Sequence, residues 1–298
     1  FAILLCFYEN NIVDFDFIRE NADYYSPSFF FPEFYEHGLK PKFPEHDVIY
    51  QTYADRLDEF RIKRKEYHSD SPLVRFILND DLEGFQTYLA STNTPLDSKI
   101  ELSPFESTPR RFYHDNDELI MYAAVFQAIN IFKFLFLNLK KKPDLLSSVV
   151  LGGNFEIFHL VESCQKVNSF TAYKAANCHQ PQLFEYIMNS YDCKIDLFFV
   201  TNIISSLNYP SLEVLVELHP KVLTKYNYIN FIFGAACFSG CRVLFDFLID
   251  LPIIDVNYHY EILLIFLFMK FKFSFGFMEI LLYIGHLKRI IFIWLENC

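Results

Sequence analysis

The stretch LGGNFEIFHLV, residues 151–161, breaks an apolar run with two glycines and an asparagine and then resumes it at once. Beyond the break, Ile157, Phe158 and Val161 stand at positions i, i+1 and i+4, which share one face of an α-helix. Glycine adopts the positive φ of a tight turn without the steric cost of a Cβ atom. The stretch therefore predicts a helix that ends near Gly152-Gly153, a tight turn, and a second helix directly after it.

The same pattern recurs along the chain. Positions equivalent to Ile157 are Phe85, Ile131, Leu183, Val214, Val243 and Ile280. We call Ile157 and these six equivalent positions the anchors. The residue four places after each of the seven anchors is apolar: Leu89, Leu135, Val161, Ile187, Leu218, Phe247 and Ile284. Small or β-branched pairs stand eight and seven places before four anchors, at Ala123-Ala124, Val149-Val150, Ala175-Ala176 and Ala235-Ala236. These pairs predict a preceding helix that packs closely on its neighbour, in a helix–turn–helix unit of about 26 to 31 residues.

The repeat predicts the fold class. One helix pair cannot bury its apolar face alone, whereas stacked pairs bury a continuous core. We therefore predict an all-α fold, an α-solenoid of about seven degenerate helix-turn-helix repeats. The composition agrees, because 52% of the 298 residues are hydrophobic, with 36 Phe and 8 Gly. Such a composition excludes intrinsic disorder and disfavours a hairpin-rich sheet protein.

Three segments resemble the helix pair of ankyrin repeats: YAAVFQAINIFKFL (122–135), KAANCHQPQLFEYI (174–187) and GAACFSGCRVLFDFL (234–248). LPIIDVN (251–257) resembles the loop that joins two ankyrin units. The sequence pattern of these repeats is similar to that of a large, divergent ankyrin-repeat family of protists with a helical N-terminal segment. The resemblance covers about residues 72–285. It implies an ankyrin-like solenoid that acts in protein–protein interaction.

The chain also departs from the ankyrin pattern. The Thr-Pro-Leu-His start of an ankyrin helix is absent from the sequence. The glycine four places before the anchor is present only as Gly153 and Gly276. Units of 26 residues are shorter than the roughly 33 residues of a full ankyrin repeat with its projecting finger. We therefore expect the binding surface on the helical face and the connecting loops rather than on fingers, with the exposed residues of the first helices taking part.

We predict three regions: a helical N-terminal cap segment (1–70), an ankyrin-like repeat domain (71–285) and an apolar C-terminal tail (286–298). Residues 48–67 predict one amphipathic helix that covers the first repeat, with its inward side chains at Ile49, Tyr53, Leu57, Phe60 and Ile62. The basic cluster at residues 61–65 indicates a solvated helix face, with a nuclear-import signal as the alternative.

The apolar block at 262–285 is long enough to cross a membrane. Lys270, Lys272 and Glu279 lie within it, and each costs roughly 2.5–3.5 kcal/mol at the centre of a spanning helix. A buried last repeat is therefore favoured, and a membrane anchor is the alternative. The apolar tail at 286–298 indicates an interface with another chain, further repeats or a drifted reading frame. The chain begins with Phe rather than Met, which is compatible with a start inside a longer reading frame.

No pattern in the sequence predicts catalytic, cofactor-binding or metal-ligating residues. Cys237 and Cys241 lack the second ligand pair of a zinc site and predict packing at a turn. Cys178 and His179 are adjacent on a helix, so their side chains point to different faces, and a nucleophile–base pair is disfavoured. The cluster His114, Asp115, Asp117 and Glu118 indicates the start of a helix rather than a cation site. Walker, G-x-S-x-G and H-E-x-x-H motifs are absent from the sequence.

These observations predict a non-enzymatic protein–protein interaction scaffold, without a cofactor. The alternative is a membrane-associated helical repeat protein anchored by residues 262–285. The formal charge of −11 disfavours binding to nucleic acid and favours a basic patch on the protein partner. Seven scattered cysteines indicate reduced thiols and hence a cytoplasmic location.

Overall fold

A computed structural model describes residues 1–20, 26–39, 47–100, 103–105, 118–196, 199–200, 202–203, 206, 208–219, 230, 233–234 and 242–249. The chain divides into two compact units, Phe1–Val167 and Asn168–Cys298. Across the described ranges the regular structure is helical, and β structure is limited to an isolated bridge between Lys99 and Glu118. The fold is all-α. The predictions for the repeat at Ile280, the block at 262–285 and the tail at 286–298 lie outside the described residues.

The first unit begins with short helices around two aromatic clusters. The helices are α1 (Ala2–Glu9), α2 (Phe15–Glu20), α3 (Ser26–Phe29), α4 (Phe31–Glu36), α5 (Asp47–Tyr53) and α6 (Leu57–Arg64). One cluster joins Leu5 and Ile18 to the rings of Phe15, Phe29 and Phe30. The other cluster contains Phe31, Phe60 and Phe105.

The single helix predicted for residues 48–67 is wrong, because α5 ends at Tyr53 and α6 begins at Leu57. The backbone of Arg56 leaves the helical region at φ −135° and ψ 41°. Its guanidinium donates to the carbonyl of Thr52 at 2.6 Å and so satisfies a carbonyl near the end of α5. Phe60 is buried as predicted, whereas Ile62 is 72% exposed and does not point inward.

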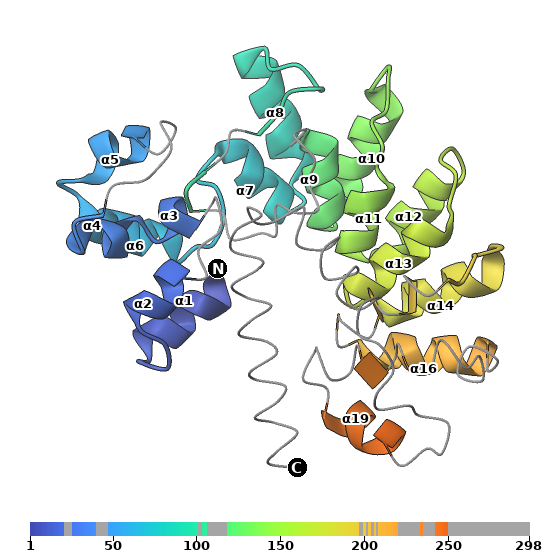
Figure 1. The fold of residues 1–298 in the computed structure, drawn as a ribbon. Helices are drawn as coiled ribbons and strands as arrows, with labels where there is room; N and C mark the ends of the chain where they lie inside the picture. Colours follow the sequence, from blue (N-terminus) through green and yellow to red (C-terminus); the bar gives the residue numbers. More distant parts are fainter. Residues whose placement is uncertain are drawn as a thin grey trace. The chain divides into compact units, whose positions relative to one another are not determined.

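Three helix pairs follow in the first unit. They are α7 (Pro72–Leu78) with α8 (Leu82–Thr92), α9 (Leu119–Val125) with α10 (Ile129–Asn138), and α11 (Leu146–Gly152) with α12 (Phe155–Glu162). The two helices of each pair contact each other. The first helices also contact in the order α7, α9, α11, and the second helices in the order α8, α10, α12 (Figure 1). Stacked helix pairs with two parallel rows of contacts form an α-solenoid.

The second unit repeats the same local pattern. Its described helices are α13 (Ser169–Asn177), α14 (Pro181–Ser190), α16 (Tyr209–Leu218) and α19 (Arg242–Ile249). Helices α13 and α14 form a pair, and α14 contacts α16. Asn208 precedes α16, and its side-chain Nδ2 donates to the carbonyl of Ala176 at 2.5 Å, near the end of α13. A hydrogen bond therefore joins successive repeats in this unit.

The turn inside each described pair has one conformation. Asp80, Gln127, Gly153 and His179 have φ values of 48°, 59°, 75° and 57°. The residue after each of them is the N-cap of the second helix. The loss of glycine at Gln127 and His179 therefore leaves the turn unchanged, although a side chain in the left-handed region is strained.

The turns correct the predicted repeat register at two places. Phe85, Phe132, Phe158 and Phe184 are each the fourth residue of their helix, and all are fully buried. Phe85 is therefore equivalent to Phe158, and Gly84 takes the anchor position. In α16 the equivalent position is Ser211, which is fully buried, whereas Val214 is half-buried and Leu218 is exposed.

The close packing predicted for the first helices is confirmed in the described repeats. Ala123, Ala124, Val150, Ala175 and Ala176 are buried. A Cβ atom added to Gly152 of α11 would lie 2.2 Å from the carbonyl oxygen of Ala124 in α9. Only a residue without a side chain allows these two helices to approach so closely.

Candidate functional site

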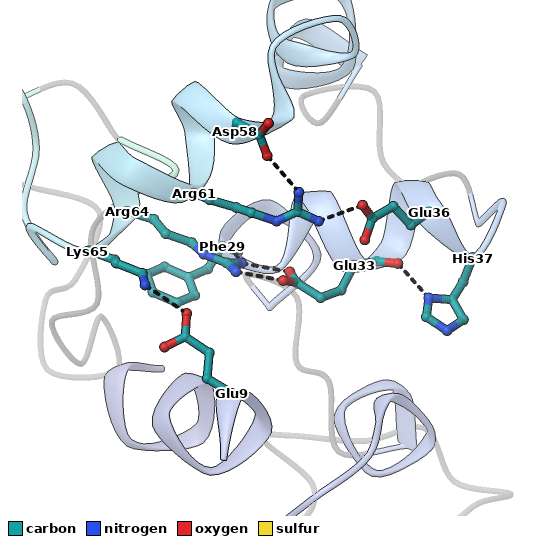
Figure 2. Close-up of polar contacts among 9 residues, drawn as sticks. All are labelled: Glu9, Phe29, Glu33, Glu36, His37, Asp58, Arg61, Arg64 and Lys65. Carbon is teal, nitrogen blue, oxygen red and sulfur yellow. Dashed lines mark hydrogen bonds and ion pairs between the residues drawn. The ribbon is translucent and has the colours of Figure 1, made fainter. Parts of the chain in front are cut away.

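A group of polar contacts joins α4 to α6 (Figure 2). Arg64 donates from Nη1 to Glu33 Oε2 and from Nη2 to Glu33 Oε1, both at 2.6 Å. Nη1 also donates to the carbonyl of Phe29 at 3.3 Å. The guanidinium carbon lies 6.0 Å from the ring centroid of Phe29 and 6.0 Å from that of Phe30. We name Glu33, Arg64 and the Phe29 carbonyl the buried clasp.

Helical spacing explains why a charged residue is buried here. Arg64 follows Phe60 by four residues, so the two side chains lie on one face of α6. Phe60 packs against Phe31, with 5.3 Å between the ring centroids. This packing turns Arg64 into the protein, where its side chain is only 2% exposed. Glu33 in the first turn of α4 supplies the matching charge.

Arg61 and Lys65, two other cations of the basic cluster at 61–65, lie beside the clasp (Figure 2). Arg61 pairs with Glu36 at 2.6 Å and with Asp58 at 3.1 Å. The hydrogen bond to Glu36 raises the pKa of Arg61 above its ordinary value, and burial opposes that effect. Lys63 pairs with Glu59 and Asp70, and Lys65 pairs with Glu9.

These pairs change the interpretation of the cluster. All four cations have carboxylate partners. The expectation of a solvated helix face is wrong at Arg64, which lies in the interior, whereas Arg61, Lys63 and Lys65 are partly exposed. Recognition as a nuclear-import signal needs accessible basic side chains. In the folded chain the clasp holds α4 against α6 and leaves the Arg64 side chain inaccessible. The role of Arg64 is therefore to stabilise the N-terminal helices rather than to bind an anion.

The thiol of Cys178 is unsuited to nucleophilic attack. Burial raises its pKa to about 11, although Lys174 has a smaller opposing effect. A thiol with this pKa is protonated at neutral pH, and the thiolate is the nucleophile. The neighbouring His179 lies in the turn before α14 with its side chain exposed.

Glu118 is the described member of the acidic cluster, while His114, Asp115 and Asp117 lie outside the described residues. It directly precedes α9, so the predicted helix start is confirmed at this position. Burial raises the pKa of Glu118, and Asp97 adds to the effect, while Lys99 and Lys141 oppose it. Cys237 and Cys241 lie outside the described residues as well.

In the described part of the chain, His, Cys, Asp and Glu side chains do not gather in a group of three or more that could hold a metal ion. In the same ranges no helix combines the length and apolar content that a membrane crossing requires. The block at 262–285 is outside those ranges.

One residue that links repeats has no counterpart among the sequence predictions. Asp80, in the turn between α7 and α8, accepts hydrogen bonds from the backbone N–H groups of Asn130 at 3.1 Å and Ile131 at 3.0 Å. It also accepts from Asn130 Nδ2 at 2.9 Å. The N-cap residue of α10 is Ala128, which has no side-chain acceptor. Asp80 therefore caps a helix of the neighbouring repeat, and the alanine at the N-cap position is the only sequence signal for it.

Comparison with known proteins bears on the repeats. Residues 137–216 match the family model described as "Domain of unknown function (DUF3447)", a family found in ankyrin-repeat-containing proteins. The match covers α11 to α14 and most of α16. Neither the curated proteins nor the solved structures searched gave a significant match. The stacked helix pairs and the family match agree that this chain is a helical-repeat protein.

Proposed function

We propose that the chain is a non-enzymatic scaffold that binds a protein partner through the exposed side of its stacked helix pairs. One observation carries the proposal: the first helices α9 and α11 have no exposed residue, whereas the second helices paired with them, α10 and α12, do. Residues Leu119 to Ala124 of α9 are all buried, so this first helix is used for packing. In these two repeats the proposed contact surface therefore lies on the second helices and the loops.

The second helices offer both apolar and charged side chains. Leu137 in the last turn of α10 is 80% exposed. Lys133 of α10 and Glu156 of α12 form an exposed ion pair that links neighbouring second helices. Three exposed lysines, Lys140 to Lys142, follow α10 in the loop. A surface with an apolar residue beside charged ones resembles a polar-rimmed protein contact more than a catalytic cleft.

The loop after α10 is held in place. Gln165 Nε2 donates to the carbonyl of Pro143 at 2.7 Å, and its Oε1 accepts from the backbone N–H of Leu145 at 2.9 Å. A fixed loop loses less conformational entropy on binding than a mobile one. This supports a contact role for the end of α10 and the loop that follows it.

Affinity capture tests the scaffold. The full chain is used as bait, and captured proteins are quantified by mass spectrometry beside two variants. Leu137→Asp places a charge on the proposed surface, while Ile62→Asp places one at an exposed position on α6. The proposal expects a protein that the wild type and Ile62→Asp retain and Leu137→Asp loses. Equal capture by all three, or turnover in a hydrolase and transferase screen, would contradict it.

The membrane alternative rests on the apolar composition of residues 262–285. Flotation of the full chain with lipid vesicles distinguishes the two functions. A scaffold stays at the bottom of the gradient, whereas an anchored protein floats and remains in the lipid fraction at high salt, because an inserted apolar helix is insensitive to screening.

A further inference from the structure

Helix α1 has two apolar faces, and in the described part of the chain one of them packs into a hydrophobic cluster while the other is exposed. Leu5 is fully buried, and Phe1, Leu4 and Tyr8 pack against the same cluster. Ile3 and Phe7 stand at i and i+4 on the opposite side of the helix and are 72% and 42% exposed. Ile12, just after the helix, is 66% exposed. We name Ile3, Phe7 and Ile12 the outer face of α1.

The backbone holds Ile12 beside the end of α1. Its N–H donates to the carbonyl of Phe7 at 2.9 Å, and Asn11 adopts the left-handed conformation with φ 55°. Asp14 then accepts from the N–H of Phe17 at 2.8 Å and fixes the start of α2. These bonds close the connection from α1 to α2, which are adjacent in Figure 1. The outer face is therefore built by ordered backbone, and binding there needs little additional ordering.

Charge restricts what can occupy this face. Residues 1–20 carry four carboxylates, on Glu9, Asp14, Asp16 and Glu20, and one cationic side chain, on Arg19. Arg19 is 3.0 Å from Asp16 and Lys65 is 3.2 Å from Glu9, so two of the four carboxylates have a cationic partner, and Asp14 and Glu20 keep the segment negative. A second copy of this chain would bring like charges together, and an anionic membrane would be repelled in the same way.

We propose that the outer face of α1 binds an amphipathic helix of a partner protein, with apolar side chains on Ile3, Phe7 and Ile12 and with lysines or arginines opposite the carboxylates. Helices bind in this way through apolar anchors at i, i+3 or i+4 spacing. The proposal depends on the scaffold function in one respect only, namely that the chain has a protein partner. It uses a surface separate from α10, so the two can fail independently.

The test uses the full chain and three synthetic peptides. One is an 18-residue amphipathic helix of Leu and Lys, one is the same composition scrambled to remove the apolar face, and one replaces Lys by Glu. Titration calorimetry gives the affinity for wild type, for Ile3→Ser/Phe7→Ser and for the control Ile62→Ser. All three substitutions are at exposed positions, and circular dichroism confirms that the variants fold.

The proposal expects wild type to bind the amphipathic Leu/Lys peptide at least tenfold more tightly than either other peptide. Ile3→Ser/Phe7→Ser should weaken that binding at least tenfold, which corresponds to about 1.4 kcal/mol, while Ile62→Ser changes it less than twofold. Equal binding of the scrambled peptide, or no effect of the double variant, would overturn the inference.

Two further outcomes would assign the outer face of α1 to a different binding partner and would also overturn the inference. Sedimentation that shows a dimer lost in Ile3→Ser/Phe7→Ser would assign the face to a second copy. Flotation with anionic vesicles that the same variant abolishes would assign it to a membrane surface. A captured partner that depends on Leu137 while α1 binds no peptide would leave the scaffold function intact and reject only this face.

Discussion

Glu33 and Arg64 are 31 residues apart in the sequence, and both oxygens of the carboxylate lie 2.6 Å from nitrogens of the guanidinium. Both side chains are almost wholly removed from water. The Nε atom of Arg64 is buried without a hydrogen-bond partner. The free-energy cost of burying the guanidinium is therefore offset by its hydrogen bonds to Glu33 and to the Phe29 carbonyl. A buried ion pair of this kind is costly to break from one side only.

Replacing Arg64 by methionine leaves the Glu33 carboxylate buried and unpaired. We expect Arg64→Met to lower the free energy of unfolding by about 3–5 kcal/mol, and Glu33→Leu/Arg64→Met to recover much of the loss, because the double variant buries no charge. Chemical denaturation followed by circular dichroism measures both. As a control, Arg61→Met breaks the two more exposed pairs with Glu36 and Asp58 and should cost no more than about 1 kcal/mol. Equal losses for Arg64→Met and Arg61→Met would show that the clasp does not hold the N-terminal helices.

The cap that Asp80 provides to α10 predicts a local effect in the next repeat. We expect Asp80→Ala to cost about 1–2 kcal/mol, since two backbone N–H groups lose their acceptor and Ala128 cannot replace it. Amide hydrogen exchange should increase at Asn130 and Ile131. The exposed carboxylate of Asp55 is 3.9 Å from Arg56, and Asp55→Ala should change stability by less than about 0.5 kcal/mol. Unchanged exchange in α10 would contradict the cap.

The common turn conformation predicts opposite effects of glycine at different places. Gln127→Gly and His179→Gly should each raise the free energy of unfolding by about 0.5–1 kcal/mol, because both residues have positive φ. Gly153→Ala should lower it by a similar amount. Gln86→Gly, at an exposed position inside α8, is the matched control and should destabilise by about 1 kcal/mol. Thermal unfolding checks the signs, and a loss of stability in Gln127→Gly would exclude the common turn.

The approach of α11 to α9 leaves no space at Gly152. We expect Gly152→Ala to destabilise by about 1–3 kcal/mol, because the added Cβ would meet the Ala124 carbonyl. At Gly38 a Cβ would have no atom within 4 Å, so Gly38→Ala should cost only the strain of its positive φ, about 1 kcal/mol. Denaturant titration measures both variants. Equal tolerance of the two substitutions would mean that the first helices are further apart.

The raised pKa of the Cys178 thiol predicts that its reactivity depends on pH. Its pKa is raised from 9.0 to about 11 by burial, so the folded protein keeps the thiol protonated where the unfolded chain ionises it. The stabilisation is complete below pH 9 and is lost as the pH rises towards 11. At pH 8, maleimide labelling mapped by mass spectrometry should modify the exposed Cys6 and Cys164 and spare Cys178. Comparable labelling of all three at pH 8 would contradict a buried thiol.

The repeat could be predicted from the sequence because its signal is a long, regular pattern of apolar residues. The register was harder to obtain, because alignment on apolar residues selects Phe85 over Gly84 and Val214 over the buried Ser211. Backbone conformation, rather than hydrophobicity, defines the equivalence, and the positive φ of Gln127 or His179 leaves no trace in residue type.

The clasp and the break before α6 could not be predicted from the sequence, because both depend on contacts made by arginine side chains. The guanidinium of Arg56 donates to the Thr52 carbonyl near the end of α5, and residues 54–56 contain neither the Pro nor the Gly that usually marks a break. The position of Arg64 four residues after Phe60 was the only indication that it is buried, and nothing local in the sequence identifies Glu33 as its partner.

Stacking of consecutive helix pairs is the central claim, and zero-length carbodiimide cross-linking tests it most directly. Lys133 of α10 and Glu156 of α12 are in contact in the stack, so peptides joined through these two side chains are expected, and Glu156→Gln should remove them. The pair of Lys65 and Glu9, 3.2 Å apart, serves as an internal control within the N-terminal helices. Formation of the Lys65–Glu9 link without the Lys133–Glu156 link would contradict the stacked repeat.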